Sequence, residues 1–148
     1  MVDEGGDVVA AGAFAASLAR RGRNVKLLWQ HDPTQPIGVW ESLREDARGL
    51  RVSGRLLSEV RRGAEAAALL KAGAVDGLSI GYRVIRSEKT AQGGRRLLEV
   101  DLWEVSLVTF PMLQAARAVT PAVAPADEEA AAARAVAEAL RAARNAII

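Results

Sequence analysis

One serine and the single histidine of this chain have the surroundings that nucleophilic catalysis requires. Ser79 lies between glycines in residues 77–81 (GLSIG), which match the G-x-S-x-G pattern of serine hydrolases. A serine hydroxyl attacks a carbonyl carbon only when a neighbouring base takes its proton. Histidine is the side chain that ordinarily titrates near neutral pH, so the sequence predicts that His31 is this base.

The glycine-flanked serine does not by itself indicate an α/β-hydrolase. In that fold the serine lies on a sharp turn between a strand and a helix, and a histidine follows it in the chain. Here residues 80–85 are typical of a strand, and no histidine follows Ser79. Because triads are defined by geometry rather than by chain order, the order His31, Ser79, acid remains compatible with a serine hydrolase of another fold.

A third group is needed to orient the imidazole. Glu104 is the preferred acid because it interrupts the apolar run of residues 102–108, and an acid in such a place needs a partner. The other candidates are Asp32, Glu99 and Asp101.

Each predicted site residue also has an interpretation that involves no chemistry. His31 would be a surface residue in a loop before a proline, and Ser79 would lie between glycines only to permit close packing of strands. Glu104 would lie on the solvent face of an amphipathic strand. The tryptophans at positions 29, 40 and 103 are expected in the core rather than in a substrate pocket.

Composition excludes several other kinds of site. The chain has no cysteine, which excludes a disulfide scaffold, a thiol nucleophile, a zinc finger and an iron–sulfur site. With one histidine a catalytic zinc is not expected either, so neither metal nor cofactor is predicted. The net charge of +2 does not favour nucleic-acid binding. No apolar run is long enough to cross a membrane, and acids precede the apolar residues 8–19 while arginines follow them, the reverse of a secretory signal. An intracellular compartment is therefore expected.

The elements that must position these residues are mainly strands. We expect strands at residues 25–29, 37–44, 50–57, 77–86 and 95–109, with residues 45–49 as a hairpin turn in which Gly49 takes a positive φ. Residues 1–23 are expected to be a loop followed by a short helix, in which Phe14 and Leu18 face the core and Gly22 ends the helix. A second helix is expected at residues 64–72, closed by Gly73.

The composition also divides the chain into a domain and a tail. Residues 1–118 form the predicted domain, residues 119–126 are rich in Pro and Ala and are typical of a linker, and residues 127–148 are an Ala-rich helix candidate. Acids in the first turn and arginines near the end of that tail suit a helix dipole. The tail would be a docking helix, a segment removed by self-cleavage near the linker, or a disordered segment with neither role.

Five segments form a consistent series along the chain, with the serine and the histidine inside two of them. They are residues 6–14, residues 27–32 with 36–38, residues 49–56, residues 68–82 and residues 104–111. In order and spacing, over about residues 5 to 117, they resemble the motifs of the tailed-phage prohead protease family. The family's histidine and serine fall on His31 and Ser79, and Glu104 is our choice for its third member.

This resemblance implies a serine endopeptidase of capsid maturation. Such enzymes act inside the procapsid, in the cytoplasm of the bacterial host, on the scaffold or on the scaffolding segment of the capsid protein, and often on themselves. The particle would belong to a phage, a prophage or a gene transfer agent, and the expected partners are the major capsid protein and the scaffold. Association with further copies of the same chain is left open, whereas binding to nucleic acid or to a membrane is not expected.

The resemblance also carries an expectation about the fold. The expected class is α+β: a mainly antiparallel β-barrel wrapped by short helices, as in herpesvirus assemblins. Family members usually have a strand before the motif at residues 6–14, and that strand is expected to be missing here, which would leave a sheet edge open. Two other functions remain open at this point: a non-catalytic scaffold or assembly protein on a degenerate protease fold, and a small β-barrel binding module with no viral role.

Overall fold

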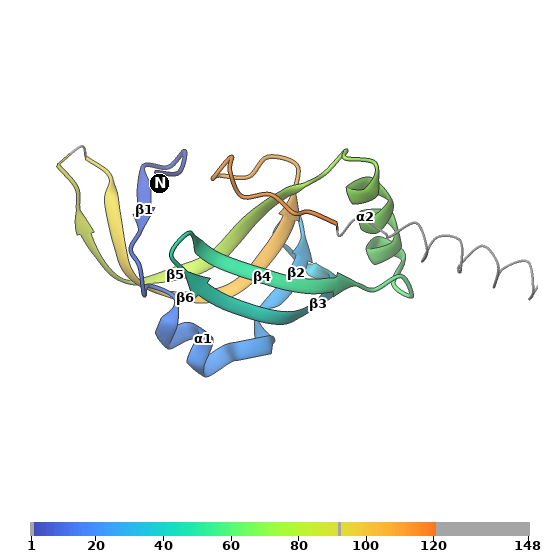
Figure 1. Ribbon diagram of the computed structural model, residues 1–148, viewed down its shortest axis with the longest axis horizontal. Helices are drawn as coiled ribbons and strands as arrows, with labels where there is room; N and C mark the ends of the chain where they lie inside the picture. The colour runs from blue at the N-terminus through green and yellow to red at the C-terminus, as the bar shows by residue number, and fades with distance from the viewer. Residues whose placement is uncertain (1, 92, 121–148) are drawn as a thin grey trace, which may run out of the picture.

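The computed structural model describes residues 2–91 and 93–120, which form an α+β fold around one mixed sheet (Figure 1). Its strands are β1 (Asp7–Val9), β2 (Lys26–Trp29), β3 (Asp32–Asp46), β4 (Gly49–Leu56), β5 (Gly77–Lys89) and β6 (Arg95–Val108). The helical elements are α1 (Ala15–Arg21), the 3₁₀ turn η1 (Gly22–Asn24) and α2 (Arg61–Lys71). Among these residues there is no helix with the length and apolar character needed to cross a membrane.

β6 is the central strand of the sheet. It pairs with β5 in antiparallel fashion along its whole length, from Arg95 opposite Lys89 to Val108 opposite Gly77. On its other edge it pairs in parallel with β1 at residues 95–97 and with β2 at residues 104–107. From β2 the sheet continues antiparallel to β3 and then to β4. β6 therefore brings the segments around Ser79, Glu104 and the end of β2 side by side.

The segment around α1 covers the stretch of β6 between β1 and β2. The Val100 N–H donates to the Ala13 carbonyl (3.1 Å), and the Leu102 N–H donates to Ser17 Oγ (2.8 Å). Ser17 is fully buried. These contacts satisfy backbone donors of β6 on the edge between its pairings with β1 and β2, so the segment around α1 takes the place of a strand there.

The hairpin of β3 and β4 is confirmed. Asp46 pairs with Gly49 at its turn, and Gly49 has a φ of 133°, a conformation that favours glycine. The expected orientation of Phe14 and Leu18 is confirmed as well, because Phe14 is buried and Leu18 packs against the core from α1. The core draws on both helices and on β2, β3 and β6, through Phe14, Val25, Leu27, Ile37, Trp40, Ala66, Val75, Leu97, Val100, Leu102, Val105 and Leu107.

The expected α+β class is confirmed, but the expected mainly antiparallel β-barrel is wrong in that the sheet does not close into a barrel. Within the described residues, β4 pairs only with β3, and β5 pairs only with β6 apart from a single bridge between Gly77 and Arg117. Closure would require β4 and β5 to pair, because a barrel has no edge strands. The parallel pairs of β6 with β1 and with β2 also make the sheet mixed.

A strand lies in the N-terminal segment, where only a loop was expected before the helix. β1 has three residues, too few to show a period, and a long-range contact holds it in place. The Asp7 carboxylate accepts hydrogen bonds from Arg95 Nε (2.9 Å) and Nη2 (2.6 Å), which keep the pKa of Asp7 below its ordinary value. The residues before β1 fold back along it, with Val2 bridged to Val8. The edge of β1 is thus covered in part.

α2 begins at Arg61 rather than at residue 64, the expected start. Glycine is a poor helix former, so the pattern predicts a start after Gly63. The structure includes Gly63 in the helix, where a side chain would collide with the backbone carbonyls of Leu57 and Ile37, so this glycine serves close packing of α2 and does not mark its start. The expected end is confirmed: Gly73 has a φ of 70° and its N–H donates to the Leu70 carbonyl. Except for Val119 and Thr120, the expected linker and tail lie outside the described residues.

Candidate active site

His31 lies in a two-residue turn between β2 and β3. Gln30 and His31 both have positive φ values, 51° and 61°, which non-glycine residues rarely adopt. Contacts with the end of β6 hold this turn: the Gln30 N–H donates to the Leu107 carbonyl (3.0 Å), and Gln30 Nε2 donates to Thr109 Oγ1 (2.8 Å). Backbone strain of this kind persists only where surrounding contacts impose it. The turn therefore presents the imidazole in a defined direction.

Glu104 is in direct contact with the imidazole. His31 Nδ1 lies 2.5 Å from Glu104 Oε1, and the other carboxylate oxygen accepts a hydrogen bond from Ser106 Oγ (2.6 Å). Glu104 is buried, whereas the His31 side chain is 43% exposed. A carboxylate on Nδ1 favours the tautomer with the proton on Nδ1, which leaves Nε2 free to accept a proton.

The register of β5 and β6 places Ser79 on the same face. Ser79 lies directly opposite Ser106, and Gly81 lies directly opposite Glu104. Residues opposite each other in an antiparallel pair project from one face, with Cβ atoms about 4.5–5.5 Å apart. Ser79, Ser106 and Glu104 therefore share a face, and His31 reaches that face through its contact with Glu104.

The structure thus brings His31 and Glu104 together and places Ser79 beside them without a hydrogen bond to the imidazole. Within residues 2–91 and 93–120, Ser79 Oγ makes no hydrogen bond, and no fully buried side-chain polar atom is left without a partner. The Ser79 hydroxyl therefore retains access to solvent, although the residue is only 9% exposed. Hydrogen bonds between a nucleophile and its base are often longer before a substrate binds.

The two glycines that flank Ser79 have steric reasons to be there. A Cβ on Gly77 would lie 2.6 Å from the Val108 carbonyl oxygen, and a Cβ on Gly81 would overlap the Glu104 carboxylate. Gly81 thus makes the room that Glu104 occupies. The G-x-S-x-G match reflects close packing of β5 against its neighbours, which was the alternative interpretation of these glycines, and this packing includes the acid of the site.

A β-bulge in β6 sets the orientation of Glu104. Gly81 pairs with Glu104 and Tyr82 pairs with Leu102, so Trp103 is an extra residue with no opposite partner. The bulge lets Leu102 and Val105 both reach the core while Glu104 faces His31. It also leaves the Trp103 side chain 47% exposed. The expectation that Trp103 lies in the core is therefore wrong, whereas Trp40 is buried and Trp29 packs against the core.

The other three candidate acids are held elsewhere. Asp32 accepts hydrogen bonds from Thr34 and Gln35, which lower its pKa. Glu99 lies opposite Arg86 in the strand pairing, away from His31.

Asp101 binds the arginines at the end of α1. The hydrogen bonds from Arg21, followed by those from Trp103 and Arg20, hold the pKa of Asp101 far below its ordinary value of 3.8. Its carboxylate ties α1 to β6, which is a structural role.

Three residues of the site were not singled out from the sequence. Ser106 contacts both Glu104 and the His31 backbone, and Gln30 and Thr109 hold the histidine turn. Ser106 is two residues after Glu104 on β6, so the strand period of two could have predicted that both side chains share a face. The contact between Gln30 and Thr109 depends on parallel pairing of β2 with β6, which the sequence does not reveal.

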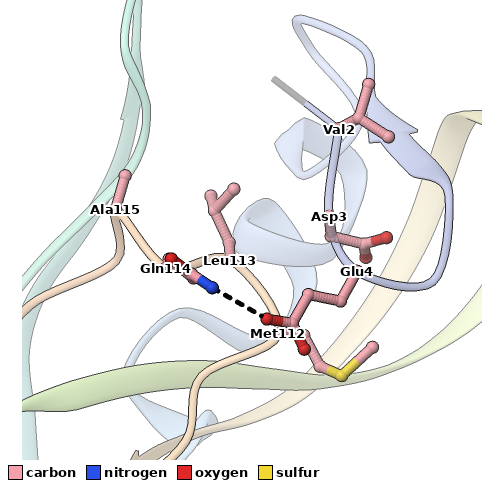
Figure 2. Close-up of a pocket in the computed structure, with 7 residues that line it drawn as sticks. All are labelled: Val2, Asp3, Glu4, Met112, Leu113, Gln114 and Ala115. Carbon is pink, nitrogen blue, oxygen red and sulfur yellow. Dashed lines mark hydrogen bonds between the residues drawn. The ribbon is translucent and has the colours of Figure 1, made fainter.

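Two surface cavities of the described residues have linings that do not include His31, Ser79 or Glu104. One, of about 380 Å³, lies between the N-terminal residues and residues 112–115, where Gln114 Nε2 donates to Glu4 (3.1 Å; Figure 2). The other, of about 630 Å³, begins at Thr34, three residues after His31, and its far side is formed by residues 60–62.

Comparison with known proteins identifies the family. The family model for the Caudovirus prohead serine protease matches residues 1–133. The prohead protease of Enterobacteria phage HK97 is 36% identical over 112 residues, which are 74% of this chain and 50% of that protein. The capsid polyprotein of Pseudomonas phage PAJU2 is 33% identical over 94 residues, which are 59% of this chain and 14% of the polyprotein.

The chain therefore spans about half the length of the HK97 protein and a small part of the polyprotein. No solved structure gives a significant match. The resemblance found in the sequence motifs is confirmed, because the family model covers nearly all of the 148 residues. The chain belongs to the Caudovirus prohead serine protease family.

Proposed function

We propose that this chain is a serine endopeptidase of capsid maturation in which Ser79 is the nucleophile, His31 the general base and Glu104 the acid that orients the imidazole. The observation that carries the proposal is the 2.5 Å contact between His31 Nδ1 and Glu104 on the face of the sheet that Ser79 shares. Membership of a prohead serine protease family supports the same assignment.

The proposed mechanism is acyl transfer in two steps. His31 Nε2 takes the proton of Ser79 as Oγ attacks a peptide carbonyl, and the imidazolium then gives this proton to the leaving amine. A water molecule activated by the same imidazole releases the acyl group from Ser79. Glu104 stabilises the imidazolium and keeps Nδ1 protonated.

The proposed substrate is the scaffold or the scaffolding segment of the major capsid protein, inside the procapsid in the bacterial cytoplasm. The PAJU2 relative is a capsid polyprotein, so a related segment is joined to capsid sequence in one chain. That connection supports association of this chain with capsid protein. The particle would be that of a phage, a prophage or a gene transfer agent.

Reaction with a fluorophosphonate, followed by intact-mass analysis, tests the proposal. The wild type should gain one adduct and the Ser79→Ala variant none, because only an activated serine reacts with this probe. Ser53→Ala is the matched control, since Ser53 is an exposed serine on the distant strand β4 and should leave the adduct unchanged. Co-expression with the capsid protein should then give cleavage that depends on Ser79.

The alternative is a non-catalytic assembly protein on the same fold. It predicts a folded wild type that gains no adduct but still binds capsid protein. That outcome would overturn the protease proposal and leave family membership intact.

A further inference from the structure

We propose that Ser106 is a positioning residue that holds His31 and Glu104 in their reactive arrangement, an inference that rests on the proposed protease function. Ser106 is fully buried on β6, directly opposite Ser79. It lies two residues after Glu104, so both side chains project from the same face of the strand.

The Ser106 hydroxyl closes a ring of contacts around the imidazole. Its oxygen accepts a hydrogen bond from the His31 backbone N–H (3.1 Å), and its proton is donated to Glu104 Oε2 (2.6 Å). Glu104 Oε1 completes the ring at His31 Nδ1 (2.5 Å). A hydroxyl has one donor and can accept at the same time, and both capacities are used here.

This ring fixes two variables that proton transfer depends on. The bond to Oε2 stops the buried carboxylate from rotating, so that Oε1 faces Nδ1 and the proton of the neutral imidazole stays on that atom. The bond from the His31 N–H anchors a backbone position with a φ of 61°, which an unsupported histidine would leave. Together they keep Nε2 directed toward the face that carries Ser79.

A buried serine on α1 that also contacts β6 provides a matched control. Ser17 is also fully buried, and its hydroxyl accepts from the Leu102 N–H (2.8 Å). It joins α1 to β6 and contacts neither His31 nor Glu104. Ser17→Ala and Ser106→Ala each remove one buried hydroxyl, so a purely structural role predicts similar consequences for both variants.

The experiment uses the fact that the chain has a single histidine, whose ring nitrogens give unambiguous NMR signals. With ¹⁵N-labelled histidine, the nitrogen chemical shifts of His31 report which atom carries the proton. The second-order rate constant of fluorophosphonate labelling reports activation of Ser79, and thermal unfolding reports the fold.

We expect the wild type and Ser17→Ala to hold the proton of the neutral imidazole on Nδ1. In Ser106→Ala a substantial fraction should move to Nε2, and labelling should slow by about 10- to 100-fold, since a small misplacement of a reacting group costs up to about 10² in rate. Unchanged tautomer and labelling in Ser106→Ala would overturn the inference. So would equal effects in Ser17→Ala, or an Ser106→Ala protein that fails to fold.

The tautomer measurement separates this inference from the proposed function. Suppose that the wild type does not react with the fluorophosphonate, holds the proton on Nδ1, and loses this preference in Ser106→Ala. This result would disprove the protease and support the positioning role. A wild type with the proton on Nε2 would overturn the positioning role whatever its labelling rate.

Discussion

At the level of single residues, the site depends on a carboxylate that β6 buries beside an imidazole. Glu104 is buried, and its two oxygens contact His31 and Ser106. A buried carboxylate with both oxygens bound has little freedom to move. Glu104 therefore contacts His31 from a fixed position on β6.

Replacing Glu104 with glutamine should separate its charge from its shape. We expect Glu104→Gln to slow fluorophosphonate labelling by about 10³–10⁴, the loss typical when the acid of a triad becomes an amide and the imidazole takes the wrong tautomer. Asp32→Asn is the control, because Asp32 adjoins His31 in the chain but binds Thr34 and Gln35. Equal rates in the two variants would refute the role of Glu104.

Gly81 provides a second test of the same carboxylate without changing it. In Gly81→Ala the new methyl group would overlap the Glu104 carboxylate, which must then leave His31 or shift β5. We expect labelling to slow by about 10- to 100-fold, with circular dichroism like that of the wild type. Labelling at the wild-type rate in a folded variant would mean that the position of Glu104 does not limit the reaction.

At the level of elements, α1 contacts β6 along the stretch of sheet edge between the pairings with β1 and β2, where the described residues form no strand pair. Asp101 on β6 binds Arg21 through both carboxylate oxygens, at 2.9 and 3.0 Å, and Arg20 at 3.0 Å. These partners lower the pKa of Asp101, so folding favours its charged form. The contact is therefore sensitive to acid.

The pH dependence of unfolding should show this contact. A lowered pKa in the folded state means that the stabilisation is fully present above the ordinary aspartate value of 3.8 and is lost as the pH falls from there through the folded-state pKa. We expect Asp101→Asn to be less stable than the wild type at neutral pH and to lose less stability on acidification to pH 3, measured by urea unfolding.

A second carboxylate in an ion pair, Glu41, provides the control for the pH dependence of unfolding. Glu41 pairs with Arg55 at 3.7 Å, and both side chains are more than half exposed. Exposed pairs contribute little to stability, so Glu41→Gln should leave the acid dependence as it is in the wild type. A wild-type acid dependence in Asp101→Asn would show that the α1–β6 contact does not couple folding to protonation.

At the level of the whole molecule, the open sheet leaves the C-terminal segment beside the strand that carries Ser79. The Leu78 N–H donates to the Ala116 carbonyl (2.9 Å), the Ala118 N–H donates to the Asp76 carbonyl (2.7 Å), and Arg117 pairs with Asp76 (2.7 Å). The chain therefore continues toward residues 119–126 from an attachment on β5.

We propose that the chain cuts itself in the expected linker, since residues 116–118 hold the C-terminal segment beside the strand that carries Ser79. We expect the incubated wild type to lose a C-terminal fragment by a cut within residues 119–126, seen as a fall in intact mass, because that segment has the composition of an accessible linker. The Ser79→Ala protein should keep its full mass. A fragment that also forms from Ser79→Ala would point to a contaminating protease, and an intact wild type would contradict self-cleavage.

The sequence by itself determined the features of local structure that depend on residues close together in the chain. The alternation along β4, the turn at Gly49 and the closure of α2 at Gly73 are local effects of side-chain period and of glycine conformation, and each is present in the structure. The series of motifs that includes Ser79 and His31 predicted the family, and the family model matches residues 1–133. Local burial of charge pointed to Glu104, the acid that the structure places against His31.

Only the tertiary structure decided the features that depend on contacts between residues far apart in the sequence. β1 is too short to show a period and is defined by its pairing with β6, where Asp7 meets Arg95, and position 63 inside α2 must be glycine because two backbone carbonyls leave no room for a side chain. The bulge that exposes Trp103, the parallel pairing of β2 with β6 and the open sheet follow from strand pairing across long stretches of chain. The role inferred for Ser106 arises in the same way, since its two partners meet only when β2 and β6 lie side by side.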